Sequence, residues 1–158
     1  MWRKDIRLSD SELQESIQEL EEVFNRAWLD QLSENCNFHP LVQAATVGEG
    51  RHQILYILQV SAFIKNLRGV TGFNRVLNDY KKVETARSAE TELFIADVLI
   101  QSGFEVEFIP PKPKKGRTPD ILVKWNDQKF VVECKYLQDA RAERWIEEYR
   151  FHYFRLID

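Results

Sequence analysis

Residues 118–136 read TPDILVKWNDQKFVVECKY, and this stretch indicates how the C-terminal half of the chain folds. Two apolar runs flank Asn126-Asp127, a dipeptide that suits the turn of a β-hairpin. Three charged residues interrupt these runs, namely Asp120, Glu133 and Lys135. They are either charges on a solvated face of the hairpin or members of a functional site.

The register of this predicted hairpin brings the three charges together. A symmetric loop centred on Asn126-Asp127 places Asp120 directly opposite Glu133. Directly opposed side chains have Cβ atoms only ~5 Å apart, and two carboxylates at that separation repel each other unless a cation lies between them. A hard divalent cation, which takes oxygen ligands, suits this position. Lys135 would stand beside it, because alternate strand residues share a face and Cys134 points the other way.

The rest of the chain supplies helices before the hairpin and one further strand. FEVEFI at 104–109 alternates as a strand does, so three strands follow one another with short links. Such an order predicts an antiparallel meander with helices packed on it, an α+β fold. Apolar periodicity predicts helices over about 10–30, 51–67, 73–82 and 84–101, with residues 33–50 irregular and helical character again after 139.

The helix predicted over 84–101 contains a carboxylate on its apolar side. At 100° per residue, Glu92 falls near the middle of the apolar arc, whereas Glu90 falls with Asp97 and Gln101 on the polar side. A carboxylate in a buried arc is costly unless it is paired or bound to metal. We therefore expect Glu92 to belong to the site and Glu90 to be solvated. The alternative for Glu92 is a carboxylate favoured by the helix dipole.

Length and composition are those of a globular protein. The chain has 158 residues, 44% apolar and 30% charged, and suits one domain with a sizeable core. Its apolar runs are shorter than the ~18 residues that indicate a membrane span. The first residues, MWRKDIRLSD, lack the apolar segment of a signal peptide. Two cysteines provide no disulfide framework. We expect a cytoplasmic protein without a membrane partner.

The net charge of −3 hides a local basic segment. Residues 109–119 contain four basic residues and no acid: Lys112, Lys114, Lys115 and Arg117. This Pro-rich loop runs directly into Asp120, so we expect it to contact the phosphate backbone of a nucleic acid. The alternative is an ordinary solvated connection.

The ordered set of motifs resembles the PD-(D/E)XK nuclease superfamily, the restriction-endonuclease-like fold. Pro119-Asp120 matches the PD, Glu133-Cys134-Lys135 matches the (D/E)XK, and Glu92 matches the helix glutamate. The spacing is similar to that of Holliday-junction resolvases and uncharacterised bacterial nuclease-like proteins. The resemblance covers about residues 84–145, and E-x-K alone would carry almost no information.

The resemblance implies a Mg²⁺- or Mn²⁺-dependent nuclease that hydrolyses phosphodiester bonds, with DNA the favoured substrate. Asp120 and Glu133 would hold the metal with the backbone carbonyl of Cys134, and Glu92 would ligate it directly or through water. Lys135 would orient the attacking water. Catalytic roles would therefore fall on Glu92, Asp120, Glu133 and Lys135.

The resemblance and the predicted helices together suggest a division of the chain. Residues 83–158 would form the nuclease core of helix, three-stranded meander and helix. A fourth strand would be either the tail FHYFRLI or missing because the chain is truncated. Residues 1–82 would form a helical region packed on that core, shaping a substrate groove or a homodimer interface. The alternatives are a catalytically inactive nucleic-acid-binding module and a protein-interaction module on the same fold.

Overall fold

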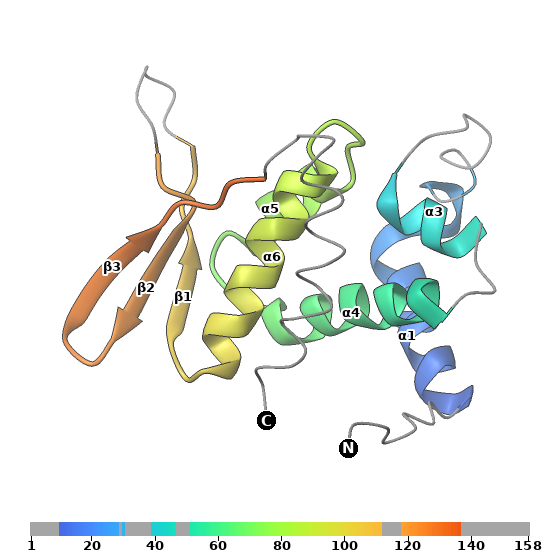
Figure 1. Cartoon of the computed structure of the whole chain (residues 1–158), viewed down its shortest axis with the longest axis horizontal. Helices are drawn as coiled ribbons and strands as arrows, with labels where there is room; N and C mark the ends of the chain where they lie inside the picture. Colours follow the sequence, from blue (N-terminus) through green and yellow to red (C-terminus); the bar gives the residue numbers. More distant parts are fainter. Residues whose placement is uncertain (1–9, 29, 31–38, 47–50, 112–117, 137–158) are drawn as a thin grey trace.

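A three-stranded antiparallel sheet and several helices make up the computed structural model, which describes residues 10–28, 30, 39–46, 51–111 and 118–136 (Figure 1). The sheet lies at one end of the molecule, α6 and α5 lie beside it, and α4 leads from them to α1 and α3 (Figure 1). The α+β class predicted from the sequence is confirmed. The elements are α1 (Asp10–Phe24), α3 (Pro40–Thr46), α4 (Arg51–Leu67), α5 (Phe73–Tyr80), α6 (Ala86–Gln101), β1 (Glu105–Phe108), β2 (Ile121–Trp125) and β3 (Gln128–Val132).

The hairpin of β2 and β3 has the predicted register. Leu122 pairs with Val131, and the regular pairing runs from Trp125–Gln128 to Ile121–Val132. Asn126 occupies the turn with φ 53°, a left-handed conformation that Asn tolerates better than most residues. Strand β1 pairs antiparallel with β2, so the sheet order β1-β2-β3 is the expected meander.

The helices α4, α5 and α6 occupy the ranges that apolar periodicity predicted, within two residues at each end. Gly69 and Gly103 follow α4 and α6 with φ of 98° and 86°, and Gly is the residue that ends helices in this conformation. None of the helices that the structure describes combines the length and apolar character of a membrane span.

The helix predicted over 10–30 is interrupted at Asn25, which corrects the sequence-based expectation. Helix α1 ends at Phe24, and Asn25 takes a positive φ of 35°. The Asn25 side chain then accepts a hydrogen bond from the amide of Trp28 at 2.9 Å, as an N-cap does. The rings of Phe24 and Trp28, on either side of this break, stack with their centroids 5.0 Å apart.

A second correction concerns residues 33–50, which the sequence predicted to be irregular with Pro40, Gly48 and Gly50 as helix breakers. Pro40 instead begins α3, since the first position of a helix needs no amide donor and favours the φ of proline. The preceding residue, His39, accepts a hydrogen bond from the amide of Leu41 on its Nδ1 at 3.2 Å. Pro40 therefore begins a helix and does not interrupt one.

One buried cluster joins the helices to the sheet. It crosses the boundary between residues 82 and 83 that the sequence suggested, because α5 packs on both α6 and β1. The largest fully buried side chains are Tyr80, Phe24, Phe108, Ile64, Leu67, Leu93, Ile121 and His39. Burial of such side chains provides most of the driving force for folding.

His39 makes the fold sensitive to mild acid. Its Nε2 lies 2.7 Å from the carbonyl of Tyr80, and because Nδ1 accepts from Leu41, Nε2 carries the proton of a neutral ring. Burial lowers the pKa of His39, the hydrogen bond to Tyr80 opposes this effect, and the charge of Arg87 adds to it. The unfolded chain therefore takes up a proton near pH 6.5 that the folded protein refuses until lower pH.

We expect the contribution of His39 to lower the free energy of unfolding, measured with urea, by on the order of 1 kcal/mol from pH 7.5 to 5.5. His39→Asn is the matched control, because its side-chain oxygen can still cap α3. It should be less stable at pH 7.5 but should lose much less stability on acidification. Equal slopes for both proteins would contradict the assignment.

Candidate functional site

Asp120 lies where the ends of all three strands meet. Its carbonyl accepts a hydrogen bond from Ile109 after β1, and its amide donates to Val132 at the end of β3, at 2.9 Å and 3.0 Å. Its carboxylate accepts a hydrogen bond from the amide of Cys134 at 2.6 Å. The residue before β2 is therefore fixed by both its backbone and its side chain, and its carboxylate is held at the end of the sheet.

Glu92 reaches the same region from α6. Its side chain is only 12% exposed and lies 2.8 Å from the guanidinium of Arg75. Burial raises the pKa of Glu92, Arg75 opposes this effect, and the negative charges of Asp120 and Asp79 add to it. Glu92 and Asp120 are therefore close enough for their charges to act on each other. The near-burial of Glu92 and its need for a partner agree with its predicted position on the helix.

Glu90 corrects the expectation that it is solvated. It is only 7% exposed, and its carboxylate pairs with Arg87 at 3.3 Å. The helical-wheel prediction was wrong because α4, α5 and β1 all pack on α6, so the buried stripe is not centred on the most apolar arc. The buried residues of α6 are Ala86, Ala89, Glu90, Leu93 and Ala96, whereas Phe94 and Val98 are exposed.

Cys134 is partly buried and packs against the core as a small apolar residue. Burial raises the pKa of its thiol to about 12, and the charges of Asp120 and Glu92 contribute to the rise. At neutral pH the side chain is therefore a thiol. The pKa of the Cys134 thiol therefore responds to the charges of both Asp120 and Glu92.

Glu133 and Lys135 are exposed, whereas Cys134 between them is partly buried. Their side chains are 43% and 58% exposed and pair with each other at 3.4 Å. The predicted direct opposition of Asp120 and Glu133 is not reached by the regular ladder, which ends at Ile121–Val132. The Asp120 amide bonds to Val132 instead of continuing the register to Glu133.

The described carboxylates suit a hard cation by their chemistry. No group of three or more acidic, histidine or cysteine side chains positioned to hold a metal occurs among the residues that the structure describes. The negative charge of Asp120 contributes to the raised pKa of Glu92. Mg²⁺ in proteins is often held by one or two carboxylates and keeps several waters. The described residues therefore form no assembled metal site, and Glu133 is paired with Lys135.

The predicted nucleic-acid contacts of the basic loop fall outside the described residues. Lys112, Lys114, Lys115 and Arg117 all lie between Pro111 and Thr118, where the description of the chain is interrupted. The tail FHYFRLI, considered as a fourth strand, also lies outside it. Both expectations stay predictions.

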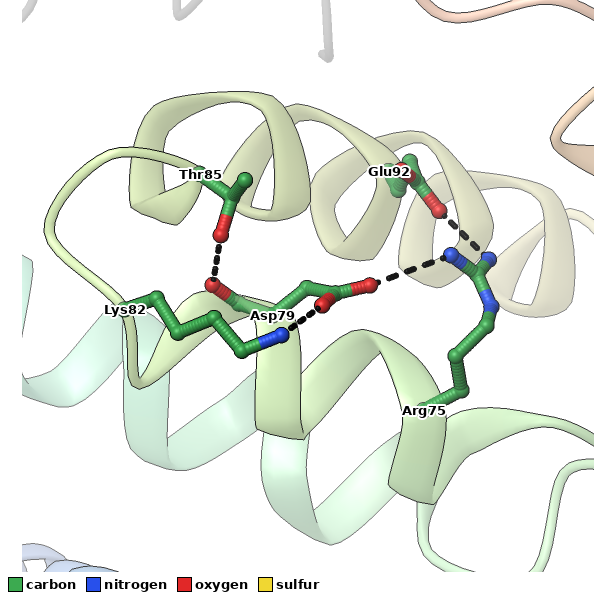
Figure 2. Close-up of polar contacts among 5 residues, drawn as sticks. All are labelled: Arg75, Asp79, Lys82, Thr85 and Glu92. Carbon is green, nitrogen blue, oxygen red and sulfur yellow. Dashed lines mark hydrogen bonds and ion pairs between the residues drawn. The ribbon is translucent and has the colours of Figure 1, made fainter. Parts of the chain in front are cut away.

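Arg75 and Asp79 belong to this region and were not predicted. Arg75 Nη1 lies 3.5 Å from Asp79 on the next turn of α5, and Nη2 contacts Glu92 on α6 (Figure 2). The Arg75–Asp79 spacing of four residues is a signal available in the sequence. The sequence gives no such signal for the contact between Arg75 and Glu92, because that contact depends on how α5 packs on α6.

Comparison with known proteins adds no identification: no family model, curated protein or solved structure matches the chain. The chemistry of the residues themselves is therefore the basis for a functional proposal.

Proposed function

We propose that this chain is a metal-dependent nuclease of the restriction-endonuclease-like kind that hydrolyses phosphodiester bonds of nucleic acid, DNA being the favoured substrate. The observation that carries the proposal is the hydrogen bond at 2.6 Å that joins the Asp120 carboxylate to the amide of Cys134, the residue between Glu133 and Lys135. It occurs at the end of the sheet where β3 leads into Glu133 and Lys135. The order of helix, three-stranded meander and the residues Glu92, Asp120, Glu133 and Lys135 supports the resemblance described above.

Each of the four side chains has a role in this proposal. Asp120 and Glu133, with the carbonyl of Cys134, would hold Mg²⁺ or Mn²⁺, and Glu92 would bind it directly or through water. The bound ion would polarise the scissile phosphate and lower the pKa of the attacking water. Lys135 would orient that water and offset charge on the phosphate, so that catalysis is mainly positioning and electrostatics.

The arrangement requires one side-chain rearrangement. Glu133 pairs with Lys135 in a half-exposed position, and exposed ion pairs of this kind contribute only ~0–1 kcal/mol. Separating the two side chains therefore costs little. Asp120 is already fixed by Cys134 and needs no large movement.

Substrate contacts and assembly follow from the sequence. The basic loop of residues 109–119 would hold the phosphate backbone close to Asp120, giving binding that weakens with salt and depends little on base sequence. The helical region before α6 would shape the groove or join two copies of the chain.

The second candidate is an inactive nucleic-acid-binding or protein-interaction module on the same fold. It is favoured by the pairing of the charges in the described structure, where Glu133 contacts Lys135 and Glu92 contacts Arg75. These pairs balance the carboxylates without a metal. Only an assay of metal-dependent cleavage of nucleic acid distinguishes the two candidates.

The test is a cleavage assay with plasmid, linear duplex, single-stranded and branched DNA and with RNA. Each substrate is incubated with the protein in Mg²⁺, in Mn²⁺ and in EDTA. The proposal expects cleavage of at least one DNA substrate that requires the metal and weakens as salt rises. Binding to nucleic acid without cleavage under any condition would favour the inactive module.

A further inference from the structure

Strand β3 forms one edge of the sheet, and no further strand pairs with it among the residues that the structure describes (Figure 1). Its side chains are exposed from Gln128 to Val131, and the exposed fractions of Phe130 and Val131 are 42% and 56%. The outer backbone groups of an edge strand are a template for pairing with another strand. Exposed apolar side chains on such an edge therefore indicate an interaction surface.

The hydrogen bonds of Asp120 show which residues of β3 direct their backbone groups outward. The Val132 carbonyl accepts from the Asp120 amide at 3.0 Å, and the Cys134 amide donates to the Asp120 carboxylate at 2.6 Å. Val132 and Cys134 therefore direct these groups toward β2 and the residue before it. Because the direction alternates along a strand, the odd-numbered residues from 129 to 133 direct their backbone groups away from the sheet.

We propose that β3 pairs with β3 of a second copy of this chain, antiparallel and centred on Val131. In this symmetric register the outward-facing residues oppose one another, so the two strands can exchange backbone hydrogen bonds. Val131 opposes the same residue of the second copy, and on either side of it Lys129 opposes Glu133. On the other face of the strands Phe130 opposes Val132. Every cross-strand pair is therefore either apolar or oppositely charged, and such pairs stabilise a sheet.

The charges of β3 favour a second copy over other strands as the partner. A lysine on an exposed edge normally discourages pairing, and Lys129 alone would have this effect. Glu133 lies two residues after Val131, just as Lys129 lies two residues before it. Glu133 is 43% exposed, and its ion pair with Lys135 is of the weak, solvated kind. A second copy in this register supplies a carboxylate to each Lys129, whereas a strand without an acid at that position does not.

The experiment measures the dissociation constant of the dimer by sedimentation equilibrium of the full chain, without metal or nucleic acid, so it is independent of the proposed function. A strand of five residues forms a small interface, and we expect a weak dimer that dissociates on dilution. Lys129→Glu and Glu133→Lys each place like charges opposite one another in both symmetry-related pairs. Each should raise the dissociation constant at least about tenfold. Lys65→Glu, which makes the same change at an exposed position of α4, is the matched control and should have no effect.

The symmetry of the contact provides a stricter test. The double variant Lys129→Glu/Glu133→Lys restores opposite charges in both pairs and should dimerise as the wild type does. An equal mixture of the two single variants should form a heterodimer, because each acid of one protein then opposes a lysine of the other. Val131→Pro should abolish the dimer. Its amide points away from β2, so proline leaves the hairpin paired and removes the central donor of the contact.

Each outcome supports or rejects the pairing of β3, once circular dichroism has shown that the variants fold. Dissociation in the single variants, with recovery in the double variant and in the mixture, supports it. Dissociation without recovery rejects the register centred on Val131. A dimer that none of the β3 variants weakens lies on another surface and rejects the proposal. A wild-type protein that is monomeric at every concentration also rejects it, and is expected if another segment of the same chain covers this edge.

Discussion

Asp120→Asn should lower the rate of metal-dependent cleavage at least about 100-fold while the protein stays folded. The carboxylate charge is what would hold the cation, and an amide is a much weaker ligand for Mg²⁺. Asn nevertheless keeps an oxygen that can accept the hydrogen bond from Cys134. Ala would remove that acceptor and leave a partly buried amide without its partner, so Asn separates chemistry from stability better. The rate is measured on the best DNA substrate.

The control for this variant is Asp127→Asn in the turn of the same hairpin, where the side chain is exposed. It makes the same chemical change at the opposite end of β2 and β3, so cleavage should stay within about twofold of the wild type. Cleavage by Asp120→Asn at a comparable rate would mean that Asp120 is no metal ligand and that the proposed site is wrong.

Lys135 can be examined with the same logic. Lys135→Met should reduce cleavage strongly, because it removes the group that would orient water and offset phosphate charge. Lys129→Met, on the exposed side of β3, is its matched control and should change the rate only slightly. Loss of activity in both would indicate a general effect of positive charge on nucleic-acid binding and not a catalytic role.

The hairpin and its flanking strand could be predicted because their determinants are local. A turn at Asn126 fixes the register, and the alternation of side chains fixes which residues share a face. Helix α3 could not be predicted in this way, because proline both begins helices and interrupts them. The N-cap of α3 is the side chain of His39, a residue that rarely caps helices. The break at Asn25 likewise depends on a cap to Trp28.

The candidate site was predicted where amphipathicity decides and missed where tertiary packing decides. Glu92 is nearly buried, as the apolar arc indicated, but Glu90 is buried too because three elements cover α6. The guanidinium of Arg75 reaches Glu92 across a helix pair, and periodicity within one helix carries no information about such a contact. The end of the ladder at Ile121–Val132 is also a detail of local geometry that register alone does not give.

Among the glycines that the structure describes, Gly72 is the one where an added methyl group should cost the most stability. It has a φ of 82°, and a Cβ placed there would lie 2.5 Å from the carbonyl oxygen of Phe108 and 2.8 Å from its Cβ. The close approach is maintained by a hydrogen bond from the Phe108 amide to Thr71 at 2.9 Å. Backbone strain and overpacking add at this site, so Gly72→Ala should cost about 3 kcal/mol or more of unfolding free energy.

Gly69→Ala is the matched control for this effect. Gly69 also has a positive φ of 98°, but nothing lies within 4 Å of the Cβ that the substitution would add. It should therefore cost only the backbone strain, about 1–2 kcal/mol. The difference between the two variants, measured by urea unfolding, isolates the contact between the start of α5 and the end of β1. Equal losses of unfolding free energy in the two variants would contradict the contact at Gly72.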